Sequence, residues 1–197
     1  VELEGLLSGL SPEQKSRISG LGIATPFELW NWEEEIGASH EVLEAWRDFD
    51  IAAEIAKLGG WPVHFSNDAT AACAAELLFG RGNRFNSYAY FFVGYFVGGG
   101  VVINGHIIPG KAGYAGALGS FPMMTPDGSP QQLTHNASLY VLENRLQAEG
   151  RDPMLLARSP EDWGEIGPAL DVWLEQTARS LAFAAVADRL LAALKAE

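Results

Sequence analysis

The sequence predicts an α/β domain with a helical C-terminal portion, and three observations lead to this fold class. Apolar runs of strand length, such as Tyr88–Val93, occur among stretches with helical spacing, such as His40–Leu58. Both the strand-like and the helical patterns occur within the first 120 residues. After Ser120 a polar loop follows, and then only helical patterns. We therefore expect an α/β lobe over residues 1–120 and a loop with a helical portion over residues 121–197.

Composition and charge argue against several classes of protein. Hydrophobic residues make up 48% of the 197-residue chain, which suits a packed core and is unlike a disordered composition. The net charge of −12 disfavours direct contact with a nucleic-acid backbone or an anionic membrane surface. The single cysteine, Cys73, lies in an alanine-rich helical run and is expected to be a buried apolar residue. We recognise no signal peptide or long apolar span, so we expect a cytoplasmic protein.

Four elements are expected before the middle of the chain. Ser11–Gln14 is typical of a helix start, with a serine cap, a proline in the first turn and a glutamine three residues after the cap. Gly20–Ala24 then has the pattern of a strand. The helix expected over His40–Leu58 is stopped by Gly59-Gly60, and a short strand follows over Pro62–Ser66.

A helix and a β-hairpin are expected next. Asn67 is suited to cap a helix that runs to about Phe79. The strand-like runs Tyr88–Val93 and Val101–Ile103 lie on either side of a glycine-rich loop. After them, Asn104-Gly105 supplies the residues of a type I′ turn, because both central positions of that turn take positive φ.

The glycine-rich loop Gly94–Gly100 resembles a phosphate-binding loop, but two of its positions are occupied by bulky aromatic residues. Glycine lets backbone N–H groups approach an anion because no Cβ stands in the way. Tyr95 and Phe96 remove that freedom at two consecutive positions. The pattern therefore predicts the scaffold of a nucleotide-dependent enzyme with a damaged nucleotide site.

The C-terminal portion is expected to contain a surface turn and three helical segments. Thr125–Pro130 is rich in turn-forming residues. Helical patterns then follow over Ser138–Ala148, around Asp152–Ala157 and over Ile166–Lys195.

Three motifs in this order resemble the ROK family, which groups bacterial sugar kinases with sugar-responsive transcriptional repressors. The motifs are Asn67-Asp68-Ala69-Thr70-Ala71-Ala72, the glycine loop with its flanking strands, and Gly110-Lys111-Ala112-Gly113-Tyr114-Ala115-Gly116-Ala117-Leu118-Gly119-Ser120. Gly20–Pro26 also resembles the strand and loop that precede the sugar site in this family. The resemblance covers about Ile18 to Ser120. It implies a ribonuclease H-like sugar-kinase fold of the actin/hexokinase type, present here in part.

The resemblance implies that Asn67 and Asp68 contact a sugar. In the kinases of this family, the aspartate of this motif accepts the proton of the sugar hydroxyl that attacks the γ-phosphate. Asp68 is therefore the candidate catalytic base if the chain is a kinase. From the residues alone, the two side chains would cap the helix that begins near Ala69.

The second sugar motif departs from the family pattern. The resemblance implies that Gly116, Ala117 and Ser120 belong to the sugar site. Hexose-binding members carry glutamate where Ala117 stands and histidine where Ser120 stands, and that histidine commonly binds zinc with downstream cysteines. Ala117 cannot accept a side-chain hydrogen bond, and no cysteine follows Ser120. We expect no zinc or other metal, and either an unusual ligand or an empty pocket.

The nucleotide side departs further. The resemblance places Gly94, Gly98 and Gly99 in a phosphate loop, but Tyr95 stands where threonine is usual and Phe96 where glycine is usual. We recognise neither the N-terminal glycine-rich hairpin nor the late glycine pair of the kinases. Phosphoryl transfer depends on positioning the phosphates and stabilising their charge. We therefore expect no cofactor, with ATP and magnesium needed only if the chain is a kinase.

We interpret the sequence as the sugar-responsive effector domain of a ROK-type transcriptional regulator, which binds a sugar or sugar derivative without phosphorylating it. It would form a homodimer, with the apolar hairpin around Phe91, Phe92, Tyr95 and Phe96 as the expected self-association surface. DNA would be bound only through a helix-turn-helix domain, which we do not recognise in these residues. Two alternatives stay open: an ATP-dependent sugar kinase that uses Asp68 as its base, and a structural or oligomerisation module without a ligand.

Overall fold

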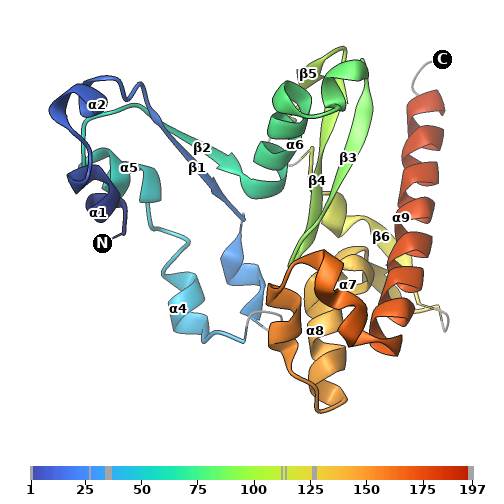
Figure 1. The fold of residues 1–197 in the computed structure, drawn as a ribbon. Coiled ribbons are helices and arrows are strands. Elements are labelled where there is room, and N and C mark those ends of the chain that lie inside the picture. The colour runs from blue at the N-terminus through green and yellow to red at the C-terminus, as the bar shows by residue number, and fades with distance from the viewer. Residues whose placement is uncertain are drawn as a thin grey trace. The chain divides into compact units, whose positions relative to one another are not determined.

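The computed structural model describes residues 2–26, 28–33, 37–111, 113, 115–125 and 128–194, with side chains as far as residue 186. The chain forms two compact units, Val1–Ala71 (unit 1) and Ala72–Glu197 (unit 2). The division falls inside helix α6 (Asp68–Phe79). It does not coincide with the boundary that we expected from the sequence at residue 120. Figure 1 shows the order of the elements along the chain.

In its described residues, unit 1 has short helices and one pair of parallel strands. The helices are α1 (Glu2–Ser8), α2 (Pro12–Ser16), α4 (His40–Glu44) and α5 (Ile51–Ala56), with a 3-10 turn at Leu29–Asn31. The strands β1 (Leu21–Thr25) and β2 (Val63–Asn67) lie within one residue of the expected positions. They run parallel, with Leu21 opposite Val63 and Thr25 opposite Asn67, so their carboxyl ends meet at one edge.

The predicted helix start at Ser11 is confirmed. The Ser11 hydroxyl accepts a hydrogen bond from the Gln14 N–H at 3.2 Å, and the Gln14 side chain accepts one from the Ser11 N–H at 2.8 Å. This reciprocal pair satisfies two N–H groups that a helix otherwise leaves without partners. The four residues therefore specify the start of α2 locally.

The single helix predicted over His40–Leu58 is wrong, because the chain forms two short helices there. α4 ends at Glu44 and α5 begins at Ile51. Asp50 lies between them in a non-helical conformation, and its carboxylate accepts a hydrogen bond from the Ala53 N–H at 2.9 Å. An aspartate in this position begins a new helix instead of continuing an old one.

Unit 2 contains most of α6 and a three-stranded antiparallel sheet. The strands are β3 (Tyr88–Val93), β4 (Val97–Ile103) and β5 (His106–Ile107), in the spatial order β3-β4-β5. The helix predicted to end at Phe79 is confirmed as α6. Asn104 and Gly105 have φ angles of 53° and 74°, which confirms the predicted turn with positive φ at both central positions. β3 lies at one edge of this sheet.

The remainder of unit 2 is mainly helical, as predicted. Helices α7 (Thr134–Ala137), α8 (Leu139–Ala148) and α9 (Pro168–Leu194) are accompanied by 3-10 segments at Gly82–Arg84, Leu118–Ser120, Pro153–Ala157 and Pro160–Ile166. A hairpin of β6 (Pro122–Met124) and β7 (Pro130–Gln132) was not predicted. Pro126 and Asp127 of the predicted turn, and Lys195 at the predicted helix end, lie outside the described residues. Among the described helices, none is long and apolar enough to cross a membrane.

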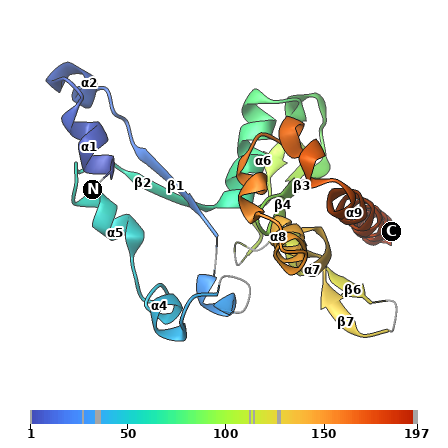
Figure 2. The ribbon, with the colours of Figure 1, turned by 60° about the horizontal axis from the view of Figure 1, so that its bottom comes forward.

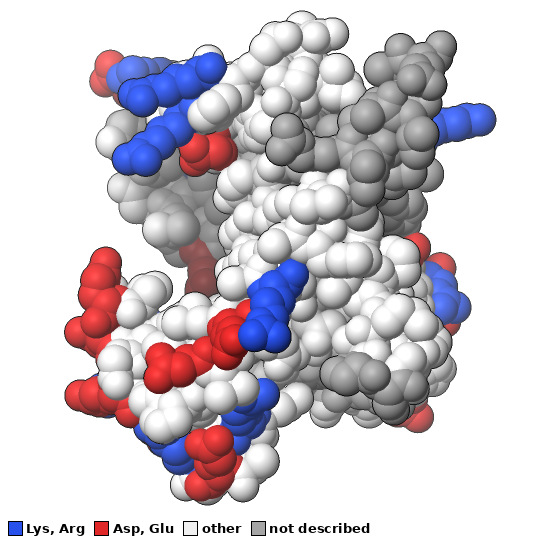
Figure 3. Space-filling view, turned by 90° about the vertical axis from the view of Figure 1, so that its right-hand side faces the viewer, with Lys and Arg blue, Asp and Glu red and all other residues white. Residues whose placement is uncertain are grey.

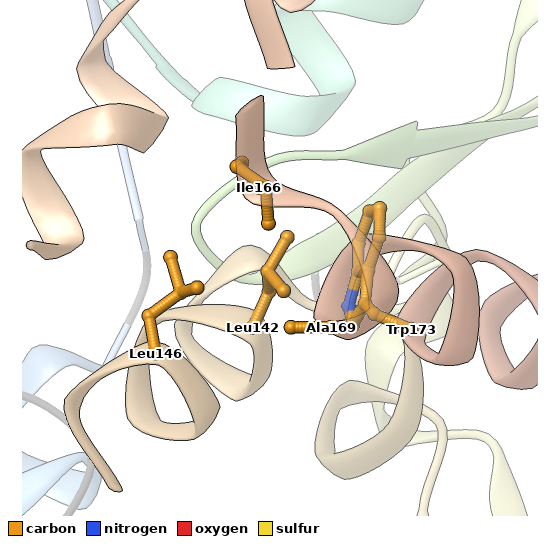
Figure 4. Close-up of a cluster of buried hydrophobic side chains, with 5 residues drawn as sticks. All are labelled: Leu142, Leu146, Ile166, Ala169 and Trp173. Atoms are coloured by element: carbon orange, nitrogen blue, oxygen red, sulfur yellow. The ribbon is translucent and has the colours of Figure 1, made fainter. Parts of the chain in front are cut away.

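Two hydrophobic clusters form the core of unit 2. The first joins α8, the segment before α9, and α9 through the buried side chains that Figure 4 shows, Leu142, Leu146, Ile166, Ala169 and Trp173. The second contains Val97, Leu133, Ala137 and Ala184, and therefore joins β4, α7 and α9. Trp173 also donates a hydrogen bond from its ring nitrogen to the Ser138 carbonyl at 3.0 Å. This indole N–H is therefore satisfied inside the core, as a buried tryptophan requires.

Helices cover both faces of the three-stranded sheet. Phe91 packs against the cluster that contains α7 and α9 residues. Gly100 pairs with Tyr90, so it belongs to the other face, because neighbours along a strand alternate. On that face an added Cβ at Gly100 would stand 2.5 Å from the Cβ of Cys73 in α6. Cys73 is fully buried, as predicted. Unit 2 is thus a helix–sheet–helix arrangement (Figures 1 and 2).

Candidate functional site

The first candidate site is the junction of β2 and α6. β2 ends at Asn67, and α6 begins at the next residue. The Asn67 side-chain oxygen accepts hydrogen bonds from the Thr70 N–H at 3.0 Å and from the Thr70 hydroxyl at 3.3 Å. Asn67 therefore caps α6. This cap fixes Asp68 as the first residue of the helix.

Asp68 has one engaged carboxylate oxygen and one open one. Oδ1 accepts hydrogen bonds from the Ala69 N–H at 2.8 Å and from the Asn67 amide at 3.1 Å. Within the described part of the chain, Oδ2 accepts none. The side chain is half-buried at a helix N-terminus, where the partial positive charge favours the carboxylate. Oδ2 can therefore accept a proton from a hydroxyl while Oδ1 helps to order the helix start.

Thr25 belongs to the same candidate site, although we did not predict it as a site residue. The parallel register places Thr25 directly opposite Asn67, at the carboxyl end of β1. Ligands of α/β folds bind outside the carboxyl ends of the strands. The sequence signal was a strand that stops at Thr25-Pro26, but its pairing with Asn67 depends on the register.

The expected phosphate loop Gly94–Gly100 is shorter in the structure than the sequence suggested. Only Gly94–Phe96 lie between β3 and β4. Gly98 and Gly99 belong to β4, opposite Phe92 and Phe91. The expectation of a seven-residue loop is therefore wrong, because the strand begins at Val97. Of the three candidate cofactor-binding glycines, Gly94 alone is in the turn.

Two glycines of β4 are explained by close packing. A Cβ at Gly99 would stand 2.2 Å from the Tyr90 carbonyl oxygen and 2.5 Å from Leu118 Cδ1. A Cβ at Gly100 would stand 2.5 Å from the Cβ of Cys73. Side chains do not tolerate such approaches, so both positions require a residue without one. The glycine pattern here does not depend on a phosphate.

The turn is fixed to the start of α8 by three main-chain groups. The carbonyl oxygens of Gly94 and Tyr95 accept hydrogen bonds from the N–H groups of Leu139 at 3.0 Å and Tyr140 at 3.3 Å. The Val97 N–H donates to the buried Ser138 hydroxyl at 2.8 Å. The first N–H groups of a helix are those that can bind an anion. Two of them in α8 already have carbonyl partners from the turn.

Aromatic rings and one carboxylate surround the turn. The Tyr95 and Phe96 rings meet edge to face with centroids 5.0 Å apart, and the Tyr140 centroid lies 5.4 Å from that of Phe96. The Tyr95 hydroxyl donates a hydrogen bond to the Glu143 carboxylate of α8. Burial first, and this bond second, raise the pKa of Tyr95 above its ordinary value. A phosphate approaching this turn would meet aromatic rings and a negative charge.

The second sugar motif lies against the start of β4, next to the turn between β3 and β4. A Cβ at Gly119 would stand 2.2 Å from the Val97 carbonyl oxygen, so the 3-10 turn Leu118–Ser120 packs on the start of β4. Gly116 is buried, whereas Ala117 and Ser120 are exposed. Unit 2 thus places the motif of Gly116, Ala117 and Ser120 beside the glycines of β4, whereas Asn67 and Asp68 belong to unit 1.

Groups with metal or nucleophile chemistry do not add a further site. In the described ranges, His, Cys, Asp and Glu side chains form no group of three that could hold a metal ion. Burial raises the pKa of the Cys73 thiol, which disfavours the reactive thiolate. Asp68, with Asn67 and Thr25 beside it, therefore stays the candidate that we expect to carry the chemistry of the site.

Comparisons with known proteins agree with these motifs. The model of the ROK family matches residues 5–137. A glucokinase of Halalkalibacterium halodurans is 33% identical over 129 residues, which are 65% of this chain and 38% of that protein. A xylose repressor of Bacillus subtilis is 29% identical over 108 residues, which are 55% of this chain and 27% of the repressor. The chain therefore spans between about a quarter and two fifths of the length of these relatives.

The fold of the chain has counterparts among solved structures. A ROK hexokinase of Thermus thermophilus superposes with a TM-score of 0.59 at 23% sequence identity, over 97% of this chain and 65% of that one. The likeness establishes the fold class, an actin/hexokinase-like sugar-kinase fold with a helical C-terminal part.

Proposed function

On the premise that the chain belongs to the ROK family, we propose that it is the sugar-responsive effector portion of a transcriptional regulator. It binds a sugar or sugar derivative and does not phosphorylate it. Relatives of both kinds, a glucokinase and a xylose repressor, match the chain. The distinction between the two rests on the turn between β3 and β4.

The observation that carries the proposal is that aromatic side chains and a carboxylate fill the space around the turn between β3 and β4. Phosphoryl transfer needs backbone N–H groups and positive charge around the phosphates. Here Tyr95 and Phe96 pack with Tyr140, and the Tyr95 hydroxyl brings the Glu143 carboxylate beside the turn. The bulk of the rings and the negative charge disfavour a phosphate at this turn, which supports the proposal of binding without phosphoryl transfer.

The sugar side supports a ligand other than an ordinary hexose. Asn67 and Asp68 lie next to one another at the start of α6, and Asp68 Oδ2 is open to accept a hydrogen bond from a sugar hydroxyl. Ala117 and Ser120 stand where the family pattern has glutamate and histidine, so two polar contacts are lost or changed. Each such contact contributes about 1 kcal/mol, roughly a factor of five in affinity. A sugar that needs fewer hydrogen bonds at this position would fit. Such a ligand could be a modified sugar or a pentose, the class of sugar that the name of the xylose repressor contains.

The remaining parts of the proposal follow from the same family. The effector acts as a homodimer in the cytoplasm, and DNA is contacted by a separate helix-turn-helix domain. It uses no zinc, and neither ATP nor magnesium is a cofactor. The net charge of −12 supports the assignment of DNA binding to a separate domain, because the acidic residues of this chain repel a nucleic-acid backbone.

A sugar kinase is the second candidate, and one observation favours it. Asp68 Oδ2 is open at a helix start, which suits a general base, and the glucokinase relative is 33% identical. A structural module without a ligand is the third candidate. The three differ in their response to sugar and to Mg-ATP.

The test is a thermal-shift screen of the purified chain against pentoses, hexoses, N-acetylated amino sugars and disaccharides, each with and without Mg-ATP. A sugar at about 100 times its Kd stabilises the folded protein by about 2.7 kcal/mol. We expect one sugar class to raise the melting temperature, no added effect of Mg-ATP, and no ATP consumption. Asp68→Ala should abolish the shift, whereas Asp48→Asn, at an exposed acid of unit 1, should keep it.

Two outcomes would contradict the proposal. Sugar-dependent ATP consumption that is lost in Asp68→Asn would establish the kinase. A folded chain whose melting temperature no sugar raises would favour the structural module.

A further inference from the structure

Asn104, in the turn between β4 and β5, is the one asparagine of the sequence that a glycine follows. An asparagine side chain can react with the main-chain nitrogen of the next residue, because the two groups are held close together and the attack closes a five-membered ring. Glycine leaves that nitrogen unhindered, since it has no Cβ. Apart from the chain neighbours of Gly105, no described atom stands within 4 Å of a Cβ added there. The turn therefore contains an electrophile and an accessible nucleophile side by side.

Asn86, which lies just before β3, holds both reacting groups in the folded hairpin. The Gly105 N–H donates a hydrogen bond to the Asn86 carbonyl oxygen at 2.7 Å, so this nitrogen loses a bond if it gives up its proton. The Asn104 side-chain oxygen accepts a hydrogen bond from the Asn86 amide at 3.1 Å, which restricts its rotation. The Asn104 N–H donates to the Ser87 hydroxyl at 3.1 Å. Reaction therefore requires residues 86 and 87 to move away from the turn first.

His106 acts on the same peptide group in the opposite direction. Its Nδ1 lies 2.8 Å from the Asn104 carbonyl oxygen and is the donor, because a carbonyl oxygen only accepts. When the Gly105 nitrogen gives up its proton, the negative charge is shared with this oxygen, and a donor aimed at it stabilises that charge. The contact lies within the turn and involves neither Asn86 nor Ser87. His106 therefore favours the step that Asn86 hinders.

We propose that Asn104 is a modification site of this protein, where the side-chain amide is lost as ammonia in a reaction that Asn86 restrains and His106 promotes. The Gly105 nitrogen loses its proton to water and forms a bond to Asn104 Cγ. The Cγ–Nδ2 bond breaks, and the leaving nitrogen takes up a proton and departs as ammonia. Water then opens the five-membered imide at either carbonyl carbon, which gives aspartate or its β-linked isomer. Asparagine and water thus become aspartate and ammonia, and no oxidant or reductant takes part.

The product places a negative charge in an uncharged part of unit 2. Residues 85–110 contain no Lys, Arg, Asp or Glu. Figure 3 shows uncharged side chains at the top of the view, the end of the sheet at which β5 lies in Figure 1. In the β-linked isomer the main chain gains a methylene group, which does not fit a two-residue turn with φ angles of 53° and 74°. We expect the short pairing of Val102 with Ile107 and of Ile103 with His106 to open.

Peptide mass spectrometry of the folded chain during incubation at neutral pH tests the site and both roles. Asn104 should show the mass gain of an amide replaced by a carboxylate before any other asparagine does. Asn86→Ala removes one hydrogen bond and should raise the rate about fivefold, whereas His106→Phe should lower it about fivefold. Asn83→Ala, at another exposed asparagine before β3, is the matched control and should leave the rate unchanged.

The same rates in concentrated urea guard against misfolding of the variants. There the contacts are absent, so the unmodified chain, Asn86→Ala and His106→Phe should react at one rate, above that of the folded unmodified chain. A variant that fails to fold reacts in buffer as fast as in urea. If Asn86→Ala does so, Ser87→Ala, which removes the acceptor of the Asn104 N–H, takes its place and should also raise the rate.

Three results would overturn parts of the proposal. A folded chain that keeps the Asn104 amide while the unfolded chain loses it would remove the modification site. A folded Asn86→Ala chain that reacts no faster than the unmodified one would remove the restraint. A folded His106→Phe chain that reacts as fast as the unmodified one, or faster, would remove the role of His106. The reaction requires no sugar, so its outcome is independent of the proposed function.

Discussion

Unit 2 has a hydrophobic core, whereas the described residues of unit 1 form very little of one. Among the described residues of unit 1, Leu43 and Ala69 are the buried apolar residues, whereas unit 2 buries twelve. Unit 1 also leaves Trp46 and Phe49 more than two fifths exposed. Residues 1–71 carry 13 acidic and 4 basic side chains, a charge of −9, against 12 and 9 in residues 72–197, a charge of −3.

This difference indicates that the two units have different stabilities. Stability within a protein varies with buried apolar contact, and the elements that respond to ligands come from its low end. Asn67, Asp68 and Thr25 belong to unit 1, the unit that we expect to be less stable. A ligand that binds there adds contacts where the chain has fewest, so its binding would change the order of unit 1 more than that of unit 2.

The largest expected effect comes from truncating the core of unit 2. Leu142 is fully buried between α8 and α9, and Leu142→Ala should lower the free energy of unfolding of unit 2 by about 3 kcal/mol, through lost burial and a cavity. Leu43→Ala, in unit 1, should leave the urea transition of unit 2 unchanged and speed amide exchange in residues 40–56. If Leu43→Ala shifts that transition as much as Leu142→Ala, the units unfold together and the comparison fails.

Two glycine-to-alanine substitutions, one in each unit, compare how tightly the strands of the two units are packed. Gly100→Ala forces its Cβ against Cys73 Cβ at 2.5 Å and should cost about 1–3 kcal/mol, because α6 must move off the sheet. Gly22→Ala, in β1 of unit 1, meets nothing within 4 Å and should be neutral or slightly stabilising. Urea unfolding of the two variants measures both effects. Recovery of stability in Gly100→Ala with Cys73→Gly would identify the contact.

Features that short segments specify were predictable from the sequence. The cap at Asn67, the capping box at Ser11 and the Asn104-Gly105 turn each depend on residues within four positions. The resemblance to the ROK family also identified the family that the comparison confirms. Local chemistry and motif order thus gave these elements and the fold class.

Features that depend on contacts between distant residues were not predictable. Gly98 and Gly99 resembled a loop, because glycine in sequence favours turns, but Leu118 and Tyr90 require a glycine at position 99 inside a strand. The β6–β7 hairpin was missed because its strands have three residues each and contain prolines, which argue against a strand. Thr25 entered the site only through the parallel register with Asn67.

The next prediction concerns a polar contact of unit 2 that is partly shielded from water. The pKa of Tyr95 is raised in the folded protein, so folding favours the neutral hydroxyl. The stabilisation that this hydroxyl contributes is complete below the ordinary pKa of tyrosine. It is lost as the pH rises through the pKa of Tyr95 in the folded state. The unmodified chain should therefore exceed Tyr95→Phe in stability by a constant margin between about pH 7 and 9, and by less above about pH 10. Urea unfolding at each pH measures the margin. Glu143→Gln should move the decline to lower pH, and a margin independent of pH would contradict the contact with Glu143.

The smallest expected effect concerns a polar contact of unit 1 that is open to water. The His40 ring nitrogen pairs with the Glu33 carboxylate, and this hydrogen bond, followed by the charge of Glu33, raises the pKa of His40 above its ordinary value. The stabilisation is complete below about pH 6.5 and disappears as the pH rises through the folded pKa of His40. Because the His40 side chain is 70% exposed, water and salt screen the pair, and little change in unfolding is expected. An NMR titration should show the raised pKa, its return toward the ordinary value in Glu33→Gln, and no change in Glu41→Gln. A large loss of stability in Glu33→Gln would show that polar contacts hold unit 1 together in place of the missing core.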